Sequence, residues 1–259
     1  MLKLYLMEAE PLLANENRIR ALELIERERI VRIERMKQEQ AQALSLAAGL
    51  LLAYAISQEK MLFSHSTACQ YEEKRPEPVY VSVEEAIAVL RRHSPLKTKK
   101  TSGGKPFLEG SRGLFFNLSH SGAYAACAVS DREVGLDIQQ CVQRVNPAVV
   151  ERVLHKEEKR IYANLPEKEK EAFFFWHWAA KEAYVKYTGE GLSNSFSGLL
   201  ADWKGGMVTD TREGKSRKLC AVEAPQGYAF AVCTEEVPMR VGAFDTPILY
   251  ENKKRKIET

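Results

Sequence analysis

The stretch EKEAFFFWHWAAKEAYVKYT, residues 169–188, decides the fold. It lacks Gly and Pro, and its apolar residues recur at steps of three and four, a spacing that predicts one amphipathic helix. Gly189 follows directly and predicts the end of that helix. Glu182 and Lys186 are four residues apart and share one face, while Lys181 flanks Glu182 on its other side. The spacing leaves two interpretations open: an ordinary salt bridge at the helix edge, or charges held in an apolar setting for chemistry.

The composition is that of a folded globular protein, with 259 residues of which 45% are hydrophobic and 28% charged. The net charge of +3 is too small to indicate nucleic-acid binding, and the N-terminal residues lack a signal-peptide pattern. The longest apolar run, residues 43–56, is too short to span a bilayer and predicts a buried helix. Five cysteines without a C-x-x-C pair indicate reduced core residues. We therefore expect a cytoplasmic protein with no nucleic-acid partner and no membrane partner.

Periodic and alternating stretches predict helices and strands arranged in two halves. We expect strands at 2–7, 114–118, 123–129, 133–139, 219–223, 228–234 and 240–244, and helices within 16–42, 44–58, 82–93, 147–164 and 169–188. Ser82 is the expected cap of its helix, because Glu85 follows three residues later. Each half begins near a strand and ends in paired strands. This places an N-terminal lobe at 1–132, a C-terminal lobe at 133–247 and a basic tail at 248–259.

Two segments are rich in cations. Arg29, Arg32 and Arg35 recur every three residues in a predicted helix, a pattern typical of a solvated face balanced by Glu. A Gly- and Lys-rich loop is predicted at 97–113, where glycines permit close backbone approach, so it could hold a phosphate or be an exposed loop. It lacks the spacing of a Walker A loop, so nucleotide hydrolysis is not indicated.

Two polar positions lie within predicted strands. Asp137 is surrounded by apolar residues, where a carboxylate needs a cation, a metal or capping backbone groups. His120 stands between Ser119 and Ser121, which invites comparison with a hydrolase. However, adjacent strand residues point in opposite directions and no G-x-S-x-G elbow is present, so that comparison is disfavoured.

Four motifs stand in a fixed order: Gly-Lys-Pro at 104–106, Asn-Leu-Ser-His-Ser at 117–121, Val-Gly-Leu-Asp at 134–137 and Trp-x-x-Lys-Glu-Ala-x-x-Lys at 178–186. In this order they resemble the 4′-phosphopantetheinyl transferase family, in its longer surfactin-synthetase-activating type, over about residues 27–191. The resemblance implies an α/β (α+β) fold of two similar lobes related by a pseudo-two-fold, each a small sheet packed with helices. It also implies a monomer, because the longer type resembles two short-type subunits fused.

The activity that the resemblance implies is transfer of 4′-phosphopantetheine from coenzyme A to a serine of an apo acyl or peptidyl carrier protein, with release of adenosine 3′,5′-bisphosphate. Coenzyme A and a divalent metal, Mg²⁺ or alternatively Mn²⁺, would lie between the lobes. The motif residues suit this chemistry. Cleaving a pyrophosphate places negative charge on the leaving oxygen, and a hard cation with Lys or Arg clamps stabilises that charge.

The resemblance places the catalytic residues in the second half of the chain. Glu182 would be the general base for the carrier serine, acting directly or through a water, and Lys186 would contact the phosphate being cleaved. Asp137 and Glu182 would be metal ligands, with Gln139 beside them. Lys181 would contact a neighbouring substrate oxygen.

The coenzyme A contacts that the resemblance implies are mostly in the first half. They are Ser119 and His120 at the 3′-phosphate and nearby groups, Lys105 and Pro106 at the adenine and phosphate side, and the basic residues Arg29 and Arg32.

Two departures from the family pattern keep alternatives open. Gln139 stands where many relatives carry an acidic residue, so the site has one negative charge less, although an amide can still coordinate a metal or hold a metal-bound water. Residues 43–45 lack the basic residue that relatives often carry there, so part of the phosphate contact is expected from elsewhere, with Lys97–Lys100 as candidates. A catalytically silent module that binds coenzyme A or a carrier is the first alternative. A nucleic-acid binder, suggested by the basic tail and the Arg-rich helix, is the second.

Overall fold

The computed structural model describes residues 1–62, 76–111, 113–142, 145–191 and 196–235. These residues form two compact units, one within Met1–Gln70 and Pro78–Glu133 and the other within Tyr71–Glu77 and Val134–Thr259. We call them unit 1 and unit 2. Each has its own hydrophobic core, as expected for a chain of this length. The strand predicted at 240–244 and the basic tail predicted at 248–259 lie outside the described residues.

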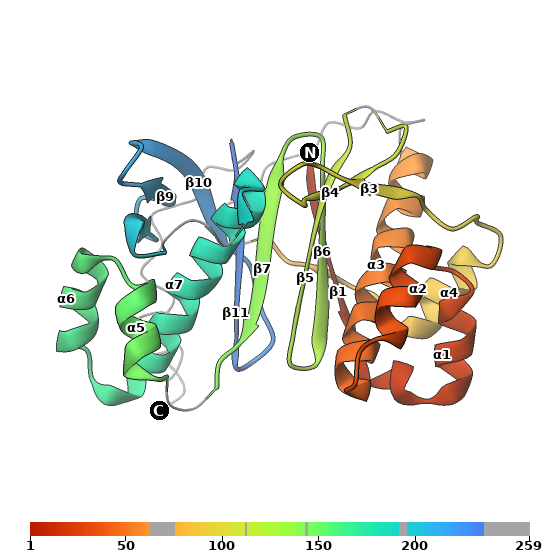
Figure 1. Ribbon diagram of the computed structural model, residues 1–259, viewed down its shortest axis with the longest axis horizontal. Helices are drawn as coiled ribbons and strands as arrows, with labels where there is room; N and C mark the ends of the chain where they lie inside the picture. Colours follow the sequence, from red (N-terminus) through yellow and green to blue (C-terminus); the bar gives the residue numbers. More distant parts are fainter. Residues whose placement is uncertain (63–75, 112, 143–144, 192–195, 236–259) are drawn as a thin grey trace, which may run out of the picture. The chain divides into compact units, whose positions relative to one another are not determined.

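Unit 1 is a four-stranded sheet with helices packed on it (Figure 1). In chain order its elements are β1 (Leu2–Glu8), a 3₁₀ turn (Glu10–Leu13), α1 (Asn15–Leu22), α2 (Arg27–Glu34), α3 (Glu39–Leu62), β2 (Val79–Tyr80), α4 (Val83–Leu90), β3 (Thr98–Lys100), β4 (Pro106–Leu108), β5 (Phe115–Ser121) and β6 (Tyr124–Ser130). The strand order is β2-β1-β6-β5, and β3 with β4 forms a separate two-stranded ribbon. The Ser82 hydroxyl accepts the amide N–H of Glu85, which confirms the predicted helix cap.

The long helix α3 forms the core of unit 1. It packs on β1, β5 and β6, and Leu46, Leu50 and Leu51 are fully buried. By length and composition alone its segment Glu39–Glu59 could cross a membrane, with a mean hydropathy of 1.3, but 83% of that apolar window is buried inside the protein. A buried helix was predicted from the apolar run at 43–56, and this prediction is confirmed.

Unit 2 is a five-stranded antiparallel sheet with one long helix across it (Figure 1). Its elements are β7 (Val134–Gln140), α5 (Pro147–Val153), α6 (Lys156–Asn164), α7 (Glu167–Thr188), a 3₁₀ turn (Phe196–Gly198), β8 (Leu199–Asp202), β9 (Met207–Asp210), β10 (Lys215–Ala221) and β11 (Tyr228–Thr234). The strand order is β7-β11-β10-β9-β8. The helix α7 contains the predicted segment 169–188 and ends at Gly189, whose φ of 72° is left-handed, as predicted.

The two units share the order of one strand, a long helix and a hairpin. In unit 1, β1 is followed by the long helix α3 and then by the hairpin β5–β6, whose second strand pairs antiparallel with β1. In unit 2, β7 is followed by α7 and then by the hairpin β10–β11, whose second strand pairs antiparallel with β7. The α/β class with a sheet and helices in each lobe is therefore confirmed. The pseudo-two-fold relation between the lobes stays a prediction.

Gly135 allows α7 to lie directly on β7. A Cβ atom at this position would come within 2.0 Å of the Ala183 carbonyl oxygen and 2.3 Å of the Tyr187 amide nitrogen. Both are backbone atoms, so no side-chain rotation could relieve the clash. Asp137 follows two residues later on β7, and Glu182 adjoins Ala183 on α7. The glycine contact therefore sets the separation between strand and helix at the predicted site.

Two segments fold differently from the sequence prediction. Segment 97–113 was expected to be a loop but contains the ribbon β3–β4, whose turn is closed by Gly104 at a φ of 85° and by a hydrogen bond from the Thr101 N–H to the Lys105 carbonyl. Segment 147–164 was expected to be one helix but divides into α5 and α6. The reason is His155, which is extended and whose side chain caps the N-terminus of α6.

We predict that Gly135→Ala lowers the free energy of unfolding by about 3 kcal/mol, because the added methyl group forces α7 away from β7. Urea unfolding followed by circular dichroism measures the loss. Gly227→Ala is the matched control: Gly227 has a φ of 81° but no neighbouring atom within 4 Å of an added Cβ. This control should lose only about 1 kcal/mol of unfolding free energy, which is the cost of placing an alanine in the left-handed backbone conformation. Equal losses in both variants would contradict the close-packing argument.

Candidate active site

Asp137 on β7 and Lys186 on α7 form an ion pair at the edge of unit 2. Lys186 Nζ donates to Asp137 Oδ1 at 2.6 Å. Asp137 is 5% exposed, whereas 27% of the Lys186 side chain is exposed. The buried carboxylate thus has the counter-charge that its apolar strand requires, and the ammonium remains accessible from solvent.

Glu182 lies one helical turn before Lys186 and is partly buried. Burial and the negative charge of Asp137 raise the pKa of Glu182, and the positive charge of Lys186 opposes this rise. Two carboxylates are therefore electrostatically coupled beside one ammonium. Such a Glu accepts a proton more readily than an exposed one, and a bound cation would favour its ionised form.

Gln139 follows Asp137 by two residues on β7, so both side chains project from the same face of the strand. Its Nε2 donates to the Gln140 carbonyl at 3.2 Å. That bond uses the amide nitrogen, and the amide oxygen is the atom of Gln139 that can serve as a metal ligand. The structure thus keeps Gln139 beside Asp137, as the sequence predicts.

The donor set suits a hard divalent cation such as Mg²⁺, because Asp137, Glu182 and Gln139 all offer oxygen. Among the residues that the structure describes, no three His, Cys, Asp or Glu side chains gather into a metal-binding group. A cation at the two carboxylates would therefore take its other oxygens from substrate phosphates and water, which is usual for Mg²⁺. It would also relieve the repulsion that raises the pKa of Glu182.

Lys181 is placed differently from the sequence prediction. Its side chain is fully buried, and Nζ donates to Glu158 Oε2 at 2.5 Å and to the Val153 carbonyl at 2.7 Å. Successive helix residues project about 100° apart, so Lys181 enters the core of unit 2 while Glu182 faces its edge. This geometry makes the Lys181 ammonium a structural group and does not support the expected contact with a substrate oxygen.

Glu158 is the partner that the sequence analysis missed. It is 1% exposed, and besides Lys181 its carboxylate accepts the N–H groups of His155 and Ala201, each at 2.8 Å. Burial lowers the pKa of Lys181 to about 8, and the charge of Glu158 opposes this shift. One carboxylate therefore ties together α6, α7 and β8.

In unit 1, Ser119 and His120 occupy adjacent positions on β5. Ser119 is buried and His120 is exposed, as expected for side chains that alternate across a strand. This alternation argues against a hydrolase-like pair of nucleophile and base. Of the two, His120 is the side chain that a ligand could reach from solvent.

Lys105 and Pro106 line a cavity of about 340 Å³ in unit 1, together with Phe107 and Phe116. Glu133, another lining residue, accepts a hydrogen bond from Lys105 Nζ. Only 11% of the Lys105 side chain is exposed. Glu133 neutralises the lysine, and the contact of Lys105 and Pro106 with the adenine and phosphate side of coenzyme A stays a prediction.

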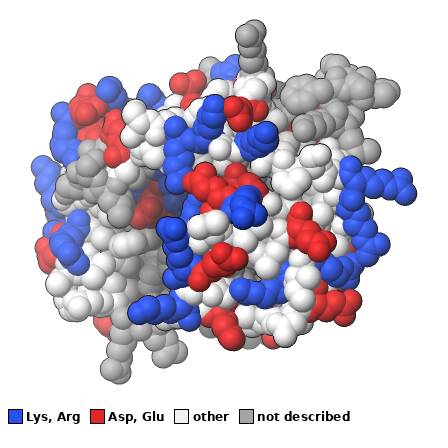
Figure 2. Space-filling model, turned by 45° about the vertical axis from the view of Figure 1, so that its right-hand side comes forward, with Lys and Arg blue, Asp and Glu red and all other residues white. Residues whose placement is uncertain are grey.

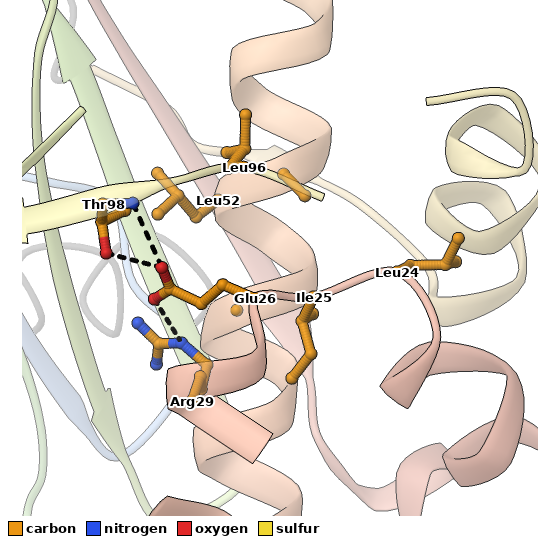
Figure 3. A pocket seen from close by; sticks show the side chains of 9 residues that line it. Leu24, Ile25, Glu26, Arg29, Leu52, Leu96 and Thr98 are labelled. Carbon is orange, nitrogen blue, oxygen red and sulfur yellow. Dashed lines mark hydrogen bonds and ion pairs between the residues drawn. The ribbon is translucent and has the colours of Figure 1, made fainter. Parts of the chain in front are cut away.

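Arg29 is buried between α2 and α3 (Figure 3). Its Nε lies 3.9 Å from Glu26 Oε1, and its Nη1 donates to the Ser45 carbonyl at 3.4 Å. Gly49 makes room for it, since a Cβ there would lie 2.5 Å from Arg29 Cδ. Burial lowers the pKa of Arg29, and Glu26 opposes this shift. Because it is 9% exposed, Arg29 supports α2 on α3 rather than presenting a cation to a ligand, unlike the sequence prediction.

All five cations predicted at the site pair with a carboxylate of their own unit. The pairs are Arg29–Glu26, Arg32–Glu28, Lys105–Glu133, Lys181–Glu158 and Lys186–Asp137. Basic and acidic side chains are likewise interspersed over the face shown in Figure 2. The pairs differ in burial: the Arg32 side chain is 44% exposed, whereas that of Lys181 is not exposed at all. Burial therefore separates cations that can reach a ligand from cations that support the fold.

Residues 133–233 match the family model of the 4′-phosphopantetheinyl transferase superfamily. This range contains β7 and α7, with Asp137, Glu182 and Lys186. The matched range thus covers most of the described part of unit 2, and the unit 1 residues other than Glu133 lie outside it.

Several curated 4′-phosphopantetheinyl transferases are similar to part of this chain. The 4′-phosphopantetheinyl transferase psf-1 of Bacillus pumilus is 33% identical over 136 residues, which are 51% of this chain and 58% of the relative. Sfp of Bacillus subtilis is 32% identical over 139 residues, which are 50% of this chain and 59% of the relative. HetI of Nostoc sp. is 39% identical over 98 residues, which are 36% of this chain and 41% of the relative. The chain therefore matches about half the length of these transferases.

Some of the missed residues had a signal in the sequence and others had none. Gly135 interrupts a strand pattern and Gly49 interrupts an apolar helix, and such glycines often mark a close approach of neighbouring groups. Glu26, Glu133 and Glu158 are ordinary glutamates locally. Their partners are distant in the sequence, or they come close only because a helix begins at that point in the folded chain.

We predict that Lys181→Met and Glu158→Gln each lower the free energy of unfolding by about 3 kcal/mol, because each leaves a buried polar partner uncompensated. The double variant should lose at least about 1 kcal/mol less than the two losses combined. A double-mutant cycle by urea unfolding measures this coupling. Strictly additive losses would contradict a direct pair.

We predict that acidification destabilises unit 2 partly through His177. This buried ring stacks on Phe173, and its Nδ1 donates to the Phe173 carbonyl at 2.7 Å. Burial lowers the pKa of His177 in the folded state, so the unfolded chain binds the proton first as pH falls below about 6.5. Stability is then lost by up to about 1.4 kcal/mol per pH unit.

The measurement is the pH dependence of urea unfolding between pH 7.5 and 5 for the native protein and for His177→Phe, whose ring can retain the stacking. The variant should show a shallower acid slope, whatever its stability at neutral pH. Identical slopes would show that His177 does not contribute.

Proposed function

We propose that the protein transfers 4′-phosphopantetheine from coenzyme A to a serine of an apo acyl or peptidyl carrier protein and releases adenosine 3′,5′-bisphosphate. The convergence of Asp137, Glu182 and Lys186 at one edge of unit 2 carries this proposal. They come from two separate motifs and lie in the range that matches the family model of the transferase superfamily. We also propose a cytoplasmic monomer, a proposal consistent with the four cysteines of the described residues, which form no disulfide.

In the proposed reaction, the serine oxygen of the carrier attacks the phosphorus on the pantetheine side of the pyrophosphate. A P–O bond to serine forms, the bridging P–O bond breaks, and the electron pair leaves on the adenosine 3′,5′-bisphosphate oxygen. Glu182 takes the serine proton, directly or through a water. Lys186 turns from Asp137 toward the phosphate oxygens and stabilises their developing charge.

We propose Mg²⁺ as the cofactor, with Mn²⁺ as an alternative, held by Asp137 and Glu182 with Gln139 beside them. When bound, it would neutralise charge on the pyrophosphate oxygens. Gln139 leaves the donor set with one negative charge less than a third carboxylate would give. We therefore expect modest metal affinity, which Gln139→Glu should raise.

A catalytically silent module that binds coenzyme A or a carrier is the alternative, and Gln139 is the residue that favours it. The arrangement on α7 favours chemistry instead. A module that only binds has no need of two carboxylates beside one accessible ammonium, whereas metal-assisted transfer uses all three.

We predict that Glu182→Gln lowers the transfer rate about 1,000-fold, because the amide cannot accept the serine proton. The assay is the intact mass of an apo acyl carrier protein after incubation with the protein, coenzyme A and Mg²⁺, where modification adds roughly 340 Da. Lys186→Ala should lower turnover about 100-fold and change the Kd for coenzyme A by less than about threefold, as expected for a charge used in the transition state.

Glu167→Gln is the matched control, since it removes the same charge from an exposed position at the start of α7. It should transfer at the native rate. If Glu182→Gln were as active as this control, the role of Glu182 would be wrong. If the native protein modified neither an acyl nor a peptidyl carrier with Mg²⁺ or Mn²⁺, the silent module would be favoured.

A further inference from the structure

Lys186 lies in the last turn of α7, close to the end of the helix. The helix ends at Thr188, and the Gly189 N–H closes the final turn by donating to the Val185 carbonyl at 2.9 Å. The last turn of a helix frays more readily than its middle, because its carbonyl groups lack helical partners. The proposed reaction uses the Lys186 ammonium in one defined place, so this turn needs a contact outside the helix to hold it.

Tyr187, the next residue of α7, makes such a contact on the opposite side of the turn. Lys186 reaches Asp137 on β7. The guanidinium of Arg217, on β10, lies over the Tyr187 ring at 5.3 Å from its centre. The strand β11 lies between β7 and β10 in the sheet (Figure 1). Successive helix residues project about 100° apart, so two adjacent side chains hold the last turn from both sides of β11.

The contact between Tyr187 and Arg217 is sheltered from solvent. Tyr187 is 7% exposed, its phenol oxygen accepts a hydrogen bond from Arg217, and its hydroxyl donates to Glu235. In the described part of the chain, Arg217 Nε is buried and has no hydrogen-bond partner. Attraction between the guanidinium and the ring face offsets this loss, and it is strongest where water is excluded. The tyrosine ring therefore has one preferred place on β10.

The alternation of β10 directs Arg217 toward α7. Leu219, two residues later, belongs to the hydrophobic core that α7 covers, so Arg217 projects from the same face of the strand. Lys218, between them, projects from the other face and is exposed. The two adjacent cations of β10 thus differ in what they contact, and Lys218 provides a control of equal charge.

We propose that Arg217 is a positioning residue for the transfer reaction, and that it acts on Lys186 through Tyr187. The inference rests on the proposed function for the role of Lys186. Gly135 sets the distance between α7 and β7, whereas the contact between Tyr187 and Arg217 sets the rotation of the last turn about the helix axis. A rotated turn would carry the Lys186 ammonium away from Asp137 and from the phosphate. Loss of the contact should therefore slow the chemical step and leave coenzyme A binding intact.

The first test is the steady-state rate of carrier modification. Arg217→Gln should lower kcat about tenfold and leave the KM for coenzyme A within about twofold of the native value. Arg217→Lys keeps a cation at the ring and should recover part of the lost rate. Lys218→Gln removes the same charge from the opposite face of β10 and should transfer at the native rate. Equal kcat values for Arg217→Gln and Lys218→Gln would overturn the inference.

Substitutions of Tyr187 test the same contact from the side of the helix. Tyr187→Leu fills the buried space without a ring or a hydroxyl, so it should lower kcat about as much as Arg217→Gln. Tyr187→Phe keeps the ring face and should lose less. If Tyr187→Leu transferred at the native rate, Arg217 would not act through the tyrosine.

A double variant shows whether Arg217 acts through Lys186. In the Lys186→Ala protein, adding Arg217→Gln should lower kcat by less than about twofold, because no ammonium is left to position. An arginine that only supports the fold would cost the same factor in both backgrounds. A loss of about tenfold in both would overturn the inference.

Hydrogen exchange gives a readout that does not depend on activity. The Gly189 N–H that bonds to the Val185 carbonyl reports the closure of the last turn. It should exchange about tenfold faster in Arg217→Gln than in the native protein, and at the native rate in Lys218→Gln. Unchanged exchange in Arg217→Gln would overturn the inference.

These outcomes separate the two proposals. A native protein that modifies no carrier would refute the proposed function, and the exchange comparison alone would then decide whether Arg217 holds the last turn of α7. A native protein that modifies a carrier, with Arg217→Gln equal to Lys218→Gln in both kcat and exchange, would refute the positioning role alone.

Discussion

The contact between Gly135 and the backbone of α7 is the constraint on which the rest of unit 2 depends. A helix normally lies on a sheet with side chains between them, but here a Cβ at position 135 would meet backbone atoms of Ala183 and Tyr187. Backbone at that distance lets Lys186 reach Asp137 at 2.6 Å and couples Glu182 to the same carboxylate. A larger separation would leave Asp137 buried without its counter-charge, which is costly. The absence of a side chain at position 135 thus allows the three charged residues of the predicted site to lie close together.

Burial then divides the charges of this site into two classes. Lys181–Glu158 lies inside unit 2, where removal of one partner would strand the other, so this pair is part of the fold. Arg29–Glu26 acts in the same way in unit 1. Lys186 keeps an exposed fraction, so its ammonium can turn toward a ligand when another cation compensates the buried Asp137. A motif of adjacent charged residues mixes both classes, because neighbours on a helix point in different directions.

Local patterns predicted local structure well in this chain. The period of α7, its end at Gly189 and the Ser82 cap are set by residues a few positions apart, and the structure has them as expected. The ribbon β3–β4 was missed because its strands are three residues long and closed by a turn rather than by apolar alternation. The partners of Lys181 and Lys105 were missed because Glu158 and Glu133 are brought to them by tertiary packing, which no spacing rule reports.

The first strand and the long helix of the two units hold their charges differently. In unit 1 the first strand and long helix also hold a carboxylate, since Glu59 of α3 meets Lys3 at 2.9 Å and accepts from the Tyr5 hydroxyl at 3.3 Å on β1. Glu59 is not exposed and has a cation beside it, so its charge is compensated inside the core. Glu182 is only partly buried and faces a second carboxylate. Both units thus hold an ion pair between the first strand and the long helix, and unit 2 adds a second, more accessible carboxylate beside its pair.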